Sequence, residues 1–169
     1  MESPERDLVA ADDGVSGGVM IAALFLGLAS AAPDGERAAV LAVVDAAFAG
    51  IAAKDEAAIR TRLRPTGTAT VIMEKADGSR TIRSVDLAAW ASVDPGLERY
   101  EERMIAPAVA IDGAMATVSG RYTFAIDGVV RHCGYQHFDL VRDSGAWKIQ
   151  NVTWSVRTFG CGAMRPGRK

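Results

Sequence analysis

The chain has 169 residues, of which 49% are hydrophobic and 24% are charged, and its net charge is −2 at pH 7. This length suits one globular domain, and the composition excludes a disordered or collagen-like chain. The charge is too close to neutral to give a basic face, so no nucleic-acid partner is expected.

The first 31 residues contain a compact apolar run, VMIAALFLGL, at 19–28, which Ala29, Ser30 and Ala31 follow. A short apolar run before a small-x-small sequence is typical of a secretory signal, and a membrane span needs about 20 apolar residues. We therefore expect residues 1–31 to be a leader with an export signal cleaved near Ala31, which predicts a secreted or periplasmic protein. The residues before the run are acidic, whereas a signal begins with basic ones, so a retained N-terminal membrane anchor and an ordinary leader remain alternatives.

A long amphipathic helix is predicted at the start of the domain. Asp34 is a good helix cap, and Glu36 lies in the first turn, where the helix dipole favours an acid. The apolar residues then follow the spacing of one helix face: Val40, Val43, Val44, Ala47, Phe48 and Ile51.

Two shorter helices are predicted next. Asp55 is expected to cap a second helix, which extends to Leu63 and stops at 65–67, where Pro and Gly occur. Ser84 is expected to cap a third helix, which carries Trp90 and ends at an Asp-Pro-Gly sequence.

The remaining segments are predicted as strands, because they are rich in β-branched and aromatic residues and are separated by Gly-containing turns. The predicted strands are 68–74 and 80–83, joined at Asp77-Gly78, and then 99–110, 114–126, 129–142 and 147–157. The last four form a meander, since tight turns connect them. The predicted order is helix, helix, hairpin, helix and four long strands, in an α+β domain over 34–161, with a disordered basic tail at 162–169.

Three segments resemble the nuclear transport factor 2-like (NTF2-like) superfamily. They are the first two helices with their Ala-Lys-Asp turn at 39–59, the hairpin and third helix at 77–87, and the last hairpin with its Gly-x-Trp-Lys-Ile step at 138–154. The superfamily includes ketosteroid isomerases, SnoaL-type cyclases, dehydratase-like enzymes and ligand-binding proteins, and the SnoaL-like and lumazine-binding-like branches are the most similar. The resemblance implies a cone-shaped α+β barrel, with three N-terminal helices packed in a strongly curved antiparallel sheet.

The steroid-isomerase active site does not carry over to this chain. The position of that family's tyrosine falls at Ala47 or Phe48, and Met73 stands where its base belongs. None of these side chains can hold or move a proton, so steroid-isomerase catalysis is not expected. The His-Asp pair of dehydratase-like members is not identifiable either.

The last hairpin predicts which side chains line a pocket. If Ser144-Gly145 is a two-residue turn, Arg142 faces Trp147, and the alternation of side chains divides the two strands into two faces. The face that covers the helices would carry a ligand pocket, together with two aromatic residues from the helices. The predicted pocket residues are Phe48, Trp90, His132, Gln136, Phe138, Asn151 and Thr153. The alternative is that the polar members only bond to one another or to helix ends.

The other face of that hairpin predicts an apolar-aromatic patch on the convex side. Its residues are Tyr135, His137, Val152 and Trp154. Large exposed patches mark interaction sites, and the superfamily often dimerises through this face, so a homodimer is expected.

His132 and His137 are five residues apart, so on a regular strand they point to opposite faces and cannot bind one metal ion. No metal and no cofactor is expected, and His132 alone is a weak candidate for a catalytic acid or base. Among the acids, Glu74 and Glu101 are candidates to face the cavity, and Tyr100 is expected to shape its mouth.

The two cysteines, Cys133 and Cys161, match no metal or redox spacing. Cys161 follows closely after the expected strand partner of Cys133, so a disulfide could attach the tail to the sheet. Two unpaired buried cysteines are the alternative.

These features favour an exported small-molecule-binding protein of the NTF2-like superfamily. The alternatives are an isomerase, cyclase or dehydratase that acts on a small carbonyl compound, and a dimeric interaction module.

Overall fold

The computed structural model describes residues 34–164, so the predicted export signal and the end of the predicted tail lie outside the described residues. The elements are α1 (Asp34–Ala53), α2 (Glu56–Arg60), β1 (Leu63–Glu74), β2 (Arg80–Asp86), α3 (Leu87–Trp90), β3 (Tyr100–Asp112), β4 (Met115–Ile126), β5 (Val129–Asp143), β6 (Ala146–Val156) and the 3-10 turn η1 (Cys161–Met164). This is the predicted α+β order. The 3-10 turn η1 extends into the first residues of the predicted tail, and the tail itself stays a prediction.

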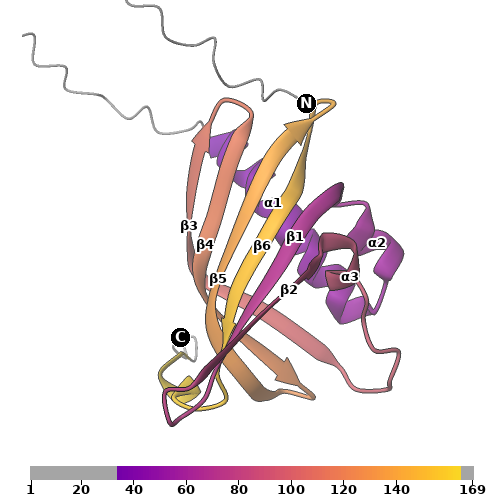
Figure 1. Ribbon diagram of the computed structural model, residues 1–169. Helices are drawn as coiled ribbons and strands as arrows, with labels where there is room; N and C mark the ends of the chain where they lie inside the picture. Colours follow the sequence, from indigo (N-terminus) through magenta and orange to yellow (C-terminus); the bar gives the residue numbers. More distant parts are fainter. Residues whose placement is uncertain (1–33, 165–169) are drawn as a thin grey trace, which may run out of the picture. The chain divides into compact units, whose positions relative to one another are not determined.

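The six strands form one curved sheet in the order β2-β1-β6-β5-β4-β3, and the helices lie along its concave side (Figure 1). The sheet was predicted to be antiparallel throughout, but β1 and β6 pair in parallel. The reason is the path of the chain: it leaves β2 at one edge, starts β3 at the other edge, and returns through the meander to β1. The sheet is mixed and unclosed, and in other respects the predicted cone is confirmed.

Helix α1 has the predicted apolar face. All six of its predicted apolar residues are buried, and they pack on the concave sheet residues Val118, Phe138, Leu140 and Ile149. Burial of such a layer stabilises the domain by roughly 25 cal/mol per Å² of apolar surface removed from water.

The two short helices differ from the prediction at their ends. Asp55 caps α2 as predicted, since its side chain accepts a hydrogen bond from the Ala58 amide at 2.9 Å, but α2 ends at Arg60 and Leu63 already belongs to β1. The cap of α3 is Asp86, because Ser84 remains in β2 and pairs with Thr70. In both places sheet pairing extends into residues that the local pattern assigned to a helix.

A β-bulge in the last hairpin changes the predicted faces. The pairing follows the predicted register from Asp143↔Ala146 to Leu140↔Ile149, and then shifts by one residue, so that Asp139 pairs with Asn151. The extra residue is Gln150, whose side-chain amide donates to the Thr66 carbonyl at 2.9 Å. Because a one-residue shift turns every later side chain over, the two faces of β6 are exchanged beyond this point.

The exchange corrects four predicted positions. Val152 is 1% exposed and belongs to the core, and Trp154 packs against that core from the concave side. Asn151 and Thr153 lie on the convex face, where they pair with Asp139 and His137. Asn151 and Thr153 therefore do not line the concave side, and Val152 and Trp154 do not form a convex patch.

Cys133 and Cys161 are joined by a disulfide with a Cα–Cα distance of 5.7 Å. Cys133 is fully buried, and its backbone pairs with Arg157 at the end of β6. The bond attaches η1 to the sheet.

In residues 34–164, no helix has the length and apolar character needed to cross a membrane.

Candidate functional site

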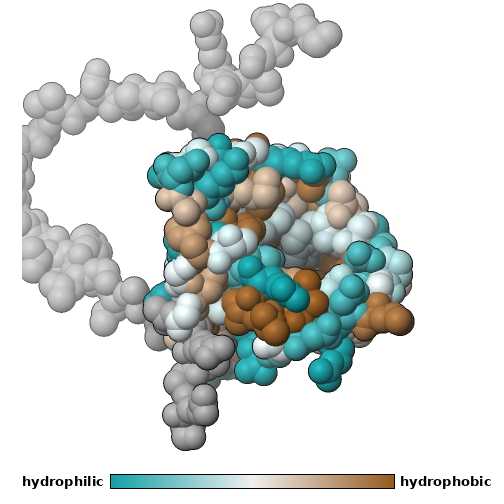
Figure 2. Space-filling model, turned by 90° about the horizontal axis from the view of Figure 1, so that it is seen from below, coloured by the Kyte–Doolittle hydropathy of each residue, from teal (hydrophilic) through white to brown (hydrophobic). Residues whose placement is uncertain are grey.

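A cavity of about 220 Å³ lies between the concave face of the sheet and the segment that joins α3 to β3. We call it the sheet cavity. Its apolar walls are aromatic and aliphatic side chains: Ile51, Trp90, Tyr100, Phe124 and Trp154. Its polar residues are Ser92 and Asp94 on the segment after α3, and Glu102, His132 and Gln136 on the sheet. Seen from below, the molecule exposes apolar residues bordered by hydrophilic ones (Figure 2).

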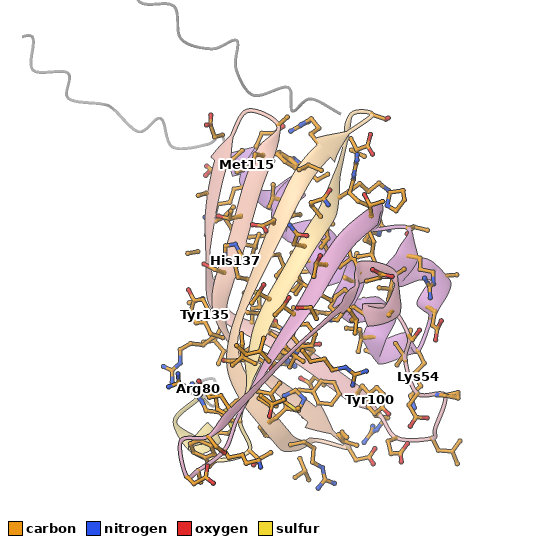
Figure 3. All side chains as sticks on the ribbon, viewed as in Figure 1. Lys54, Arg80, Tyr100, Met115, Tyr135 and His137 are labelled. Atoms are coloured by element: carbon orange, nitrogen blue, oxygen red, sulfur yellow. A yellow bond between two sulfur atoms is a disulfide. The ribbon has the colours of Figure 1, made fainter. Side chains whose placement is uncertain are left out.

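The aromatic residues hold one another in fixed orientations. Phe124 stacks on the His132 ring at 4.7 Å between centroids, and Tyr100 lies 5.5 Å from Phe124. Lys54, at the end of α1, lies 4.4 Å above the Tyr100 ring and donates to the Gly96 carbonyl, on the side of the molecule away from Tyr135 and His137 (Figure 3). Edge-to-face and stacked contacts of this kind stabilise a preformed wall.

Three sheet residues, Glu102, His132 and Gln136, form what we call the inner wall of the sheet cavity. Strand pairing places Glu102 beside Phe124, and Phe124 beside His132, so one row crosses β3, β4 and β5. Gln136 lies four residues after His132, on the same face of β5, and is 2% exposed. The rigid sheet, not a loop, therefore fixes the positions of these polar groups.

The tautomer of His132 follows from its hydrogen bonds. The Tyr122 hydroxyl donates to the Ser155 carbonyl at 3.0 Å, and a carbonyl can only accept. The same hydroxyl lies 3.1 Å from Nδ1 of His132, so Nδ1 must donate to it. Burial lowers the pKa of His132, which keeps the ring neutral and leaves Nε2 as an acceptor.

Gly134 makes room for this arrangement. It pairs with Tyr122 across the strands, and a Cβ on Gly134 would collide with the carbonyl oxygen of Ser155. Burial raises the pKa of Tyr122, so its hydroxyl remains a proton donor.

Glu102 is a titratable group with a shifted pKa. Burial raises the pKa of its carboxyl group to about 7, while a hydrogen bond from the Gln136 amide acts in the opposite direction. Near neutral pH the group can therefore take or give a proton. The two spaces that Glu102 lines, together with its electrostatic partner Tyr122, bring these titratable residues around it: Tyr122, His132, Asp94, Tyr100, Asp45, Glu101 and Arg103.

A second hollow, of about 500 Å³, lies between α1 and β3, and we call it the helix groove. Phe48, Val44 and Met104 contribute apolar surface to it, and Glu101 and Arg103 lie on its rim and form an ion pair. Glu102 lines both the helix groove and the sheet cavity. The carboxyl group therefore stands between the two spaces.

The structure brings some of the predicted pocket residues together and separates others. Trp90, His132 and Gln136 line the sheet cavity. Phe138 is buried behind it, in contact with Trp90, and Phe48 lines the helix groove instead. Asn151 and Thr153 are excluded, since the Gln150 bulge turns them outward.

The candidate acids also differ from the prediction. Glu101 is exposed on the rim of the helix groove, and Glu74 lies beside Arg80 and Arg157 at the far end of β1. The acid whose pKa burial raises is Glu102, the neighbour of Glu101, which the sequence did not single out. Side chains alternate along a strand, so Tyr100, Glu102 and Met104 share one face of β3. The two apolar neighbours on that face were the signal in the sequence that Glu102 points inward.

The convex face is polar where an apolar patch was predicted. His137 bonds to Asp139 at 2.9 Å, and Asn151 donates to the same carboxylate at 3.2 Å. Tyr135 is 49% exposed and donates to Ser119. The predicted homodimer contact loses its two apolar members, Val152 and Trp154, and the oligomeric state stays a prediction.

Within residues 34–164, no three His, Cys, Asp or Glu side chains come together in a way that could hold a metal ion. Two of the positions compared with the steroid-isomerase active site also lie away from the sheet cavity or inside the core: Met73 lies outside the cavity, and Ala47 is fully buried.

Comparison with protein-family models gives no match, and comparison with curated proteins gives no match either. Solved structures do match. An NTF2-like protein of unknown function from Shewanella baltica is 16% identical, with a TM-score of 0.53, over 73% of this chain and 95% of the other. A candidate dehydratase of the NTF2-like family from Streptomyces avermitilis is 13% identical, with a TM-score of 0.57, over 74% and 98%.

A third match is the β subunit of a candidate aromatic-ring-hydroxylating dioxygenase from Novosphingobium aromaticivorans. It is 10% identical, with a TM-score of 0.60, over 75% of this chain and 92% of the other. At these identities the likeness shows the fold alone. The chain has the NTF2-like fold, as its sequence predicted.

Proposed function

We propose that this protein binds a small, mainly apolar molecule in the sheet cavity. The observation that carries the proposal is a wall of aromatic side chains with three polar groups on the sheet behind it. Apolar cavities with a few fixed polar groups are the usual form of small-molecule sites. A volume of about 220 Å³ suits a one- or two-ring compound.

Calorimetric titration with 2-naphthol tests this proposal. Trp154→Ala removes a cavity wall, and we expect it to weaken binding by roughly tenfold or more, since burying an aromatic contact contributes about 1–3 kcal/mol. Thr153→Ala is the matched control, because Thr153 is the neighbouring residue on the convex face. Equal affinity of the two variants would refute the cavity as the site.

An exported location is part of the proposal. It is supported by the disulfide, since disulfides persist in oxidising compartments. Cleavage near Ala31 would leave α1 intact, because α1 begins at Asp34. N-terminal sequencing of the mature protein should begin near Ala32, and a mature chain that retains residues 19–28 would favour the membrane-anchored alternative.

A second function, acid–base catalysis on a small carbonyl compound, is supported by a separate observation. Glu102 and His132 face the same cavity, and burial shifts the pKa of the first upward and that of the second downward. Opposite shifts at one site divide the roles of acid and base. Protonated Glu102 would donate to the carbonyl oxygen, and Nε2 of His132 would remove the proton from the neighbouring carbon.

Exchange of the α-protons of 1-indanone in D2O, followed by NMR, measures this activity without a known substrate. Catalysis predicts faster exchange with the native protein than with His132→Gln. Equal rates for the two proteins would contradict the enzyme.

A further inference from the structure

The inner wall contains a polar atom without a partner. Gln136 Oε1 is buried and has no hydrogen-bond partner among the described residues. Its amide nitrogen donates to Glu102, and the amide cannot turn over while Glu102 is ionised, because a carboxylate only accepts. Leaving a buried acceptor unpaired costs about 1–3 kcal/mol. A ligand that donates a hydrogen bond would remove that cost.

His132 presents an acceptor to the same space. Its Nδ1 proton is committed to Tyr122, whose own proton is committed to Ser155. The remaining ring nitrogen, Nε2, therefore carries a lone pair. While Glu102 is ionised, three groups from two strands offer acceptors: the Gln136 carbonyl, the His132 nitrogen and the Glu102 carboxylate. The donors among them are the N–H bonds of the Gln136 amide, which is directed at Glu102.

Lys54 is engaged away from these acceptors. Its ammonium group donates to the Gly96 carbonyl and lies over the Tyr100 ring. Asp94 accepts from the Gly96 amide at 3.0 Å, so the segment before β3 adds another carboxylate. The charged groups near this end of the cavity therefore also favour a ligand that donates a hydrogen bond.

We propose that the ligand of the sheet cavity is a neutral aromatic or ring-fused compound whose polar group is a hydroxyl, which donates to Gln136 Oε1 or His132 Nε2. This rests on the proposed function and names its ligand class. The aromatic walls bind the ring, and the acceptor wall selects the hydroxyl over a carbonyl of the same shape. A ketone would leave the Gln136 oxygen unpaired and would bring its own lone pairs against three acceptors.

The test compares 1-indanol with 1-indanone at pH 8, where Glu102 is ionised. The two probes share one carbon skeleton and differ in the hydroxyl and the carbonyl. We expect 1-indanol to bind roughly tenfold more tightly, as measured by calorimetry. In Gln136→Leu the preference should fall toward equality, while Thr153→Val on the convex face should keep it.

A further variant covers the case in which Gln136→Leu does not fold. Glu102→Gln places an amide N–H on the inner wall, so it should raise the affinity for 1-indanone and reduce the preference.

Equal affinities in the native protein, or tighter binding of 1-indanone, would overturn the ligand class while leaving the cavity as a binding site. Binding of 1-aminoindane alone would also overturn it, since a cation would then be the preferred partner of the carboxylates. If neither 2-naphthol nor any indane probe binds, the proposed function fails together with the inference.

Discussion

The hydroxyl of Tyr122 lies 3.1 Å from Nδ1 of His132, and it connects that ring to the Ser155 carbonyl on β6. The tyrosine proton, which is donated to Ser155, therefore determines which nitrogen of the histidine is protonated. The relationship extends over three strands, because Tyr122 lies on β4 and His132 on β5. It makes the histidine an acceptor and prevents it from acting as a donor while neutral.

Removing the hydroxyl should release the histidine tautomer. Tyr122→Phe leaves the Ser155 carbonyl without its donor and the Nδ1 proton without its acceptor, so we expect a loss of about 1–3 kcal/mol in the free energy of unfolding. Nitrogen-15 NMR of the imidazole should change from the Nδ1-protonated form to a mixture. Tyr135→Phe is the control, since that hydroxyl bonds to Ser119 on the exposed face. An unchanged His132 tautomer in Tyr122→Phe would contradict the arrangement.

Glu102 should make the stability of the domain depend on pH. Its pKa rises from 4.5 to about 7 in the fold, so the folded protein holds this proton more tightly than the unfolded chain. The stabilisation is present below about pH 4.5 and is lost as the pH rises to about 7, and the total loss is about 3 kcal/mol. Urea unfolding at pH 5 and pH 8 measures it.

Glu102→Gln should reduce this dependence strongly, because it removes the titrating group. Glu101→Gln, on the exposed side of the same strand, is the matched control and should keep the dependence. If both variants lose stability between pH 5 and pH 8 to the same extent as the native protein, another group is responsible.

The disulfide should contribute measurably to stability. Cys133 and Cys161 are separated by 28 residues, and closing a loop of that length is expected to stabilise the fold by about 3.5 kcal/mol. Reductant should lower the melting temperature of the native protein and leave that of Cys161→Ser unchanged. A native melting temperature that does not respond to reductant would contradict a structural role for this bond.

The sequence predicted the elements whose patterns are local and failed where a distant strand decides. The periodicity of α1 and the Asp55 cap depend on neighbouring residues, and both were correct. Thr153 and Trp154 each lie on the face opposite to the predicted one because of the bulge at Gln150, whose side-chain amide donates to the Thr66 carbonyl on β1. No residue in the hairpin itself signals that bulge, since Gly67 on β1 is the residue that packs against the Gln150 carbonyl.

The candidate site was predicted only in part. His132 and Gln136 were found because they lie on β5, where the extra residue of β6 leaves the alternation of side chains unchanged. Glu102 was missed although it alternates with Tyr100 and Met104 on one face of β3, a signal that the sequence contained. Tyr122 was missed because its role appears only through its contacts with β5 and β6.

The three tryptophans allow the central claim, a small-molecule site in the sheet cavity, to be measured in one experiment. Trp90 and Trp154 line the cavity, while Trp147 lies near α1 and donates to Glu36 at 3.2 Å. Titration with 2-naphthol, followed by the indole N–H signals in a proton–nitrogen-15 NMR spectrum, should move the Trp90 and Trp154 signals saturably and leave the Trp147 signal in place. Saturation of the Trp147 signal alone, or three signals that do not move, would contradict the account.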